Sequence, residues 1–136
     1  DGGYTQQDVI EVARAFTGWT VARPGRDAGA GPGFVFRPEL HDRGAKTVLG
    51  RALPAGRGEQ DGLDVLHLLA THPATARHLA RKLVQRFVAD EPRPRLEAEL
   101  VRVFLASDGG LREVTRTLFS APEFHAAENR GAKLKT

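Results

Sequence analysis

Apolar residues recur every three or four positions through much of the chain, with polar residues between them. The clearest case is the stretch 73–90, where Ala76, Leu79, Ala80, Leu83 and Phe87 fall on one arc of a helical wheel. The opposite half carries Arg77, His78, Arg81, Lys82, Gln85 and Arg86. This division predicts a helix that lies on a core with one face in water, and we take it as the central packing partner of the fold.

The same period predicts further helices at about 6–17, 59–71, 94–106 and 111–119. Thr5 and Asp8 form a capping-box pattern at the start of the first helix, and Ser120 and Glu123 repeat this pattern near the end of the chain. The first helix is expected to bury Val9, Val12, Ala13 and Phe16. The broad apolar arc of 59–71 suggests burial on more than one side.

The helical period disappears between residues 19 and 50. Two short β-prone runs, 19–21 and 34–36, flank a segment rich in Gly and Pro, which predicts a two-stranded ribbon with a flexible tip at 22–33. A third run at 46–49 can add a strand, and 51–58 is expected to be a linker. The predicted fold class is mainly α, with about five amphipathic helices in orthogonal or bundle-like packing and a small β-ribbon between the first and second.

Composition is that of an ordinary globular protein. The 136 residues are 40% hydrophobic and 27% charged, which predicts a single helical domain over 1–136 with a disordered tail at 126–136. With 0 Cys, disulfides, thiol catalysis and cysteine-bound zinc are excluded. With 0 Met and a polar end, the chain is expected to be an excerpt of a longer protein, whose remainder would be a partner.

Charge and hydropathy limit the partners. The net charge of +3 is much less than a dedicated nucleic-acid binder carries, so we expect no specific nucleic acid partner. No apolar run approaches the roughly 20 residues that cross a bilayer, so we expect no membrane span.

The most interesting candidate site is formed by His41, Asp42 and Lys46. A histidine titrates near neutral pH, a carboxylate can orient it, and a lysine can hold an anion, so the three form a candidate catalytic loop. The alternative is structural: Asp42 caps a turn, His41 packs on Trp19 or a neighbouring Phe, and Lys46 pairs with a surface acid.

Other histidines and cations give weaker signals. His67, His72 and His78 lie near one helix corner, but not at the spacing of a known motif, so no metal and no cofactor is predicted, and His72 is expected to cap a helix. The stripe Arg77, Arg81, Lys82 and Arg86 is a candidate anion-binding face. Its alternative is a solvated face paired with nearby carboxylates: Asp90, Glu91, Glu97 or Glu99.

An ordered set of short motifs resembles one bacterial family. The motifs are Tyr4-Thr5, Asp8-Val9, Thr17-Gly18-Trp19, Phe34, Phe36, His41-Asp42, Lys46-Thr47, Leu49-Gly50, the run 72–77, Lys82-Leu83, the run 120–124 and the run 133–135. The chain resembles the domain of unknown function numbered eighteen hundred. This resemblance implies a longer, largely helical protein, a periplasmic or extracellular location, and a sulfatase-like neighbour as a partner. It implies no known reaction.

Three hypotheses for function follow. The leading one is a non-catalytic helical segment of a larger exported bacterial protein, which serves packing and partner or ligand binding. The second is part of a hydrolase-like enzyme whose site uses His41, Asp42 and Lys46. The third is a weak polyanion-binding module that uses the stripe on 73–90.

Overall fold

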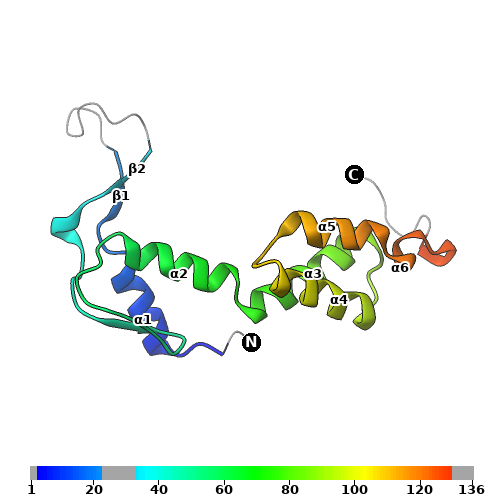
Figure 1. Cartoon of the computed structure of the whole chain (residues 1–136), viewed down its shortest axis with the longest axis horizontal. Helices are drawn as coiled ribbons and strands as arrows, with labels where there is room; N and C mark the ends of the chain where they lie inside the picture. The colour runs from blue at the N-terminus through cyan, green and yellow to red at the C-terminus, as the bar shows by residue number, and fades with distance from the viewer. Residues whose placement is uncertain (1–2, 23–32, 130–136) are drawn as a thin grey trace. The chain divides into compact units, whose positions relative to one another are not determined.

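The computed structural model describes residues 3–22 and 33–129. Contacts divide the chain into an N-terminal unit, residues 1–68, and a C-terminal unit, residues 69–136. Helices predominate, and the N-terminal unit adds two small antiparallel hairpins between its helices (Figure 1). The predicted mainly α class is therefore confirmed. Among the described residues, none of the helices is both long and apolar enough to cross a bilayer.

The N-terminal unit begins with α1 (Gln6–Ala15), which starts with the predicted capping box. The hydroxyl of Thr5 accepts the backbone N–H of Asp8, and the carboxylate of Asp8 accepts the backbone N–H of Thr5 at 2.7 Å. The predicted ribbon follows as β1 (Trp19–Val21), which pairs with β2 (Phe34–Phe36). Most of its predicted tip lies outside the described residues, and a short 3-10 helix, η1 (Pro38–Leu40), comes next.

The predicted linker at 51–58 is wrong at its start, because residues 51–53 form a strand. In the structure β3 (Lys46–Val48) does not join the ribbon but pairs with β4 (Arg51–Leu53) as a separate hairpin. Leu49 and Gly50 form a two-residue turn in which both φ angles are positive, the geometry that suits a tight hairpin. Asp8 supports this turn, because its carboxylate accepts the backbone N–H of Leu49 at 2.7 Å.

The predicted buried face of α1 is only partly right, since Val12 and Phe16 pack on the core whereas Val9 and Ala13 are exposed. Val9 is 47% exposed, whereas Ala15 is completely buried and Glu11 is only 7% exposed. This difference arises from the tertiary packing of the helix. The side of α1 that carries Asp8 and Glu11 packs against β3, and the polar groups of both residues are satisfied by hydrogen bonds. The apolar core of this unit consists of Ala15, Val48, Leu53 and Val65.

Helix α2 (Gln60–Ala70) supplies Val65 to that core. Leu63 and Leu66 remain exposed in the structure, so burial of this helix on a second side is not seen among the described residues. At the start of α2, Gly62 makes a close approach possible. A Cβ at this position would lie 2.4 Å from a ring carbon of Trp19, so only glycine lets the indole rest on the helix backbone.

The C-terminal unit begins with α3 (Pro73–Phe87), the helix that the sequence predicted as the central packing partner. This helix packs on α4 (Pro94–Ala106), which packs in turn on α5 (Leu111–Ser120) (Figure 1). The predicted helix is therefore present, but the central position in this unit belongs to α4 and not to α3. The shared core includes Ala76, Ala80, Val84, Leu96, Leu100, Phe104, Val114 and Leu118. The predicted cap is confirmed, since His72 Nδ1 accepts the backbone N–H of Ala74 at 3.2 Å.

Two details of this unit differ from the sequence predictions. Phe87 is 44% exposed rather than buried, because α3 ends there and the next residues, Val88 and Ala89, fill the core in its place. Phe87 instead meets Phe119 edge to face. The second capping box is absent, since Ser120 is the last residue of α5 and α6 (Pro122–His125) has no side-chain cap.

Residues 127–129 of the predicted tail form the short 3-10 helix η2 (Ala127–Asn129). The remaining part of that prediction, 130–136, lies outside the described residues.

Candidate functional site

The structure brings His41 and Lys46 together around a residue that the sequence analysis did not single out, Asp61 at the start of α2. The side chains of Lys46 and Asp61 are fully buried, and Lys46 Nζ lies 2.8 Å from Asp61 Oδ2. Lys46 Nζ also donates to the backbone carbonyls of Asp42 at 2.6 Å and Gly44 at 2.9 Å. An ammonium group has three hydrogens to donate, so these contacts use all of them.

His41 closes the other side of this cluster. Its side chain is 2% exposed, and its ring packs edge to face on Phe36, one of the contacts that the structural alternative predicted. Nδ1 lies 2.9 Å from the carbonyl oxygen of Thr17, which can only accept, so Nδ1 carries the proton. Nε2 then faces Asp61 Oδ2 at 3.4 Å. We call His41, Lys46 and Asp61 the buried polar cluster.

Asp42 turns away from this cluster and towards α1. Its carboxylate accepts two hydrogen bonds from the Arg14 guanidinium, at 2.9 and 3.1 Å, and lies 3.9 Å from Lys46 Nζ. It also accepts the backbone N–H of Gly44 at 2.8 Å, which is the turn-capping role predicted as an alternative. The hydrogen bonds from Arg14 and then Gly44 lower the pKa of Asp42 to about 2.

This shift gives a pH dependence with a definite sign. The pKa of Asp42 is depressed in the folded protein, from an ordinary value of 3.8 to about 2, so its contribution to stability is present above pH 4 and is lost as the pH falls towards 2. We expect Asp42→Asn to make the decline of the urea midpoint between pH 5 and pH 2 shallower. A variant whose midpoint falls as steeply as that of the wild type would contradict the assignment.

Sequence reasoning missed Asp61, Glu11 and Arg14. Neither Glu11 nor Arg14 belongs to the predicted buried face of α1, yet Arg14 bridges Glu11, at 2.7 Å, and Asp42. Asp61 stands 15 positions after Lys46, and no local pattern connects the two. One signal was available: glycine disfavours a helix interior, so Gly62 within an expected helix indicates a close contact at that point.

Protein atoms cover the buried polar cluster in the structure. The side chains of His41, Lys46 and Asp61 are 2%, 0% and 0% exposed. A hollow of about 390 Å³ lies over the neighbouring surface, along the start of α1 and residues 45–47. The polar side chains from the start of α1 that line it bind one another: Thr5 bonds to Asp8, and Gln7 bonds to Glu11. The cluster therefore joins the 41–46 loop to α2 and holds it there.

The predicted anion-binding residues, Arg77, Arg81, Lys82 and Arg86, are all exposed on α3. Among the described residues, no ion pair joins any of them to a carboxylate. The acids proposed as partners do not supply one; Glu99, for example, pairs with Arg102 on its own helix. The four cations therefore remain a candidate binding face.

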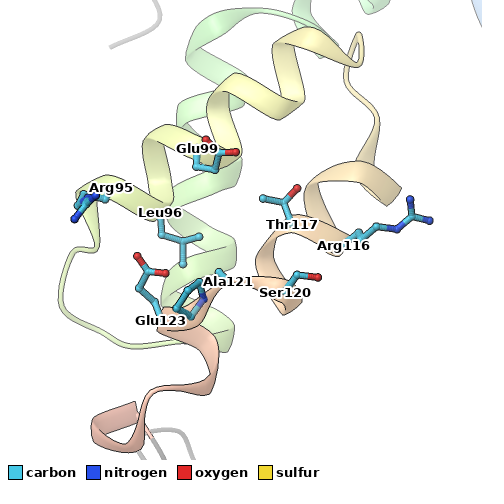
Figure 2. Close-up of a pocket in the computed structure, with 9 residues that line it drawn as sticks. Arg95, Leu96, Glu99, Arg116, Thr117, Ser120, Ala121 and Glu123 are labelled. Carbon is cyan, nitrogen blue, oxygen red and sulfur yellow. The ribbon is translucent and has the colours of Figure 1, made fainter.

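A groove of about 890 Å³ lies between α4 and α5 (Figure 2). Its floor is apolar, with Leu96 and Ala121 buried. Arg95 and Arg116 point outwards from opposite sides of it (Figure 2). The polar side chains along its rim are exposed or half-buried, so the groove offers a ligand no buried polar contact.

We compared the chain with models of known protein families. The model of the family described as "Protein of unknown function (DUF1800)" matches residues 1–136. The chain belongs to this family. The resemblance predicted from the short motifs is therefore confirmed. No curated protein and no solved structure matches the chain. Because the DUF1800 description assigns no activity, function has to be argued from the geometry of this member.

Proposed function

We propose that this segment of a DUF1800 protein is a non-catalytic module that serves packing and the binding of a partner or ligand. One observation carries the proposal: the side chains of His41, Lys46 and Asp61 are shut off from solvent. A general acid or base must come within hydrogen-bond reach of the group whose proton it moves. Here the polar atoms of Lys46 are directed entirely at protein atoms.

The arrangement supports a structural role in a second way. A buried ion pair persists only where further hydrogen bonds satisfy its remaining polar atoms, and such a network defines one arrangement of the chain around it. Lys46 bonds to two backbone carbonyls of its own loop, and His41 bonds to the backbone at the end of α1. The cluster thus determines where the 41–46 loop lies on the helices, although His41 Nε2 and Asp61 Oδ1 are buried without a hydrogen-bond partner among the described residues.

The test is the access of a small reagent to His41. Diethyl pyrocarbonate acylates accessible imidazole nitrogens, and the exposed His78 serves as the internal reference. We expect His78 to react rapidly and His41 to react only when the N-terminal unit unfolds, as read by peptide mass spectrometry. In parallel, His41→Ala should lower the stability of this unit by about 1–3 kcal/mol, because it removes a buried hydrogen-bonding side chain.

The opposite result would support an open catalytic site. Suppose that His41 reacts as fast as His78 in the folded protein and that His41→Ala leaves the urea midpoint unchanged. The buried polar cluster is then accessible to reagents, and His41 contributes nothing to the stability of the unit. The proposal of a non-catalytic module would then be withdrawn in favour of the enzyme hypothesis.

A further inference from the structure

Helix α3 has an unbalanced charge. Over its 15 residues it carries Arg77, Arg81, Lys82 and Arg86 and no Asp or Glu. Three arginines elsewhere in the described chain do bind carboxylates: Arg14 binds Asp42, Arg57 binds Asp64, and Arg102 binds Glu99. The four cations of α3 have no such ion pair among the described residues. We call them, together with His78 and Gln85 between them, the basic face.

Helical geometry arranges these side chains in two neighbouring rows. Arg77 and Arg81 form one row, and His78, Lys82 and Arg86 form the other, because residues four apart lie on the same side of a helix. The rise of about 1.5 Å per residue separates the members of a row by about 6 Å and makes the basic face about 13.5 Å long. The face is therefore a short, straight band of positive charge.

This arrangement opposes the folding of the helix. Like charges four residues apart, such as Arg77 with Arg81 and Lys82 with Arg86, destabilise a helix by a few tenths of a kcal/mol for each pair. An anionic chain that lies along the face would replace this repulsion by attraction. The basic face is thus electrostatically complementary to a linear polyanion.

The residues around the basic face indicate which class of polyanion it suits: a lipid surface, a single-stranded nucleic acid or a polysaccharide. Most of the apolar side of α3 is occupied, since Ala76, Ala80 and Val84 are buried against the other helices of this unit. Phe87 is 44% exposed but meets Phe119, so the helix has little free apolar surface to insert into a lipid surface. No aromatic residue lies among the basic residues, although proteins that bind single strands stack bases on such rings. Gln85 and His78 add hydrogen-bonding groups that can bind hydroxyls.

We propose that the basic face of α3 binds a linear acidic polysaccharide, with its arginines and lysine on the carboxylate or sulfate groups and Gln85 and His78 on the hydroxyls. Arginine forks match the planar geometry of such anionic groups. The inference names the ligand for the binding role proposed above. It does not depend on the buried polar cluster, and a reactive His41 would leave it standing.

The experiment compares wild type with Lys82→Glu. The probes are heparin, as a sulfated chain, and polygalacturonate, as a carboxylated one, titrated at 50 and 150 mM salt, with neutral dextran as the blank. We expect the wild type to bind both acidic chains, more weakly at the higher salt, and Lys82→Glu to raise Kd about fivefold to tenfold. The charge-matched control, Arg112→Glu on α5, should leave Kd within twofold of wild type.

The variant is chosen so that misfolding cannot imitate lost binding. Glu at position 82 stands four residues before Arg86, the favourable order for a helical ion pair, so the Tm of Lys82→Glu should equal or exceed that of the wild type. The proposal is overturned if the wild type binds neither polysaccharide at 50 mM salt, or if Lys82→Glu binds as well as wild type. It is also overturned if duplex DNA or phosphatidylglycerol vesicles bind more tightly than both polysaccharides.

Discussion

Replacing Lys46 by methionine is expected to lower the free energy of unfolding of the N-terminal unit by about 3–5 kcal/mol. The ammonium group contacts Asp61 at 2.8 Å with no exposure of either side chain. Methionine fills a similar volume but leaves Asp61 as an uncompensated charge in a dry interior. The cost comes mainly from that isolated carboxylate rather than from the attraction that is lost.

The double variant Lys46→Met/Asp61→Leu separates these two contributions. Replacing a buried ion pair by apolar residues of similar volume is often neutral, so the double variant should recover most of the stability lost in Lys46→Met. The single tryptophan of the chain, Trp19, rests on Gly62 beside the pair, so its fluorescence during urea unfolding reports this unit. A double variant less stable than Lys46→Met would show that the cost does not come from the isolated carboxylate of Asp61.

Leu100→Ala should destabilise the C-terminal unit by about 2–5 kcal/mol. Leu100 is completely buried at the centre of α4, among side chains from α3 and α5, and a close-packed core relaxes only partly around a cavity. Helical circular dichroism during urea unfolding measures the change.

Leu105→Ala is the matched control for this prediction. It makes the same substitution on the same helix at a residue that is 44% exposed, and we expect a change of less than about 1 kcal/mol. Equal losses in the two variants would mean that helix propensity, and not the core, determines the stability of α4.

The helices could be predicted because their signals are local. In α3 the apolar period, the proline at its first position and the capping His72 all lie within one stretch of sequence, and the observed helix begins where they indicate. Its C-terminal end was less well predicted, since the burial of Val88 instead of Phe87 depends on how the chain turns after the helix.

The elements that failed depend on distant partners. The buried side of α1 was taken to be its more apolar side, but Asp8 makes a hydrogen bond to Leu49, and Arg14 to Asp42, across 41 and 28 positions of sequence. The periodic pattern of apolar residues cannot predict which polar residues are buried, because the hydrogen-bond partner that stabilises a buried polar residue lies outside the local stretch of sequence. The strand β4 was missed because Leu at the first position of its turn is not a residue typical of a positive φ.

The candidate site was half predicted. His41, Asp42 and Lys46 were grouped because they are close in sequence, and the structural alternative named the turn capping by Asp42 and the packing of His41 on an aromatic ring. Lys46 is buried rather than at the surface because it pairs with Asp61, a residue that only the fold brings close to Lys46.

Leu49 has a consequence for anyone who would make this protein more heat-resistant. A left-handed backbone costs an L-residue roughly 1–2 kcal/mol, and glycine or asparagine would relieve that strain. Yet the Leu49 side chain is half-buried and packs on the core of the N-terminal unit, a contact that neither replacement can supply. A substitution at position 49 that relieves the backbone strain therefore loses the packing of the side chain. Mutant libraries aimed at thermostability would do better to vary the exposed residues of the hairpin around it.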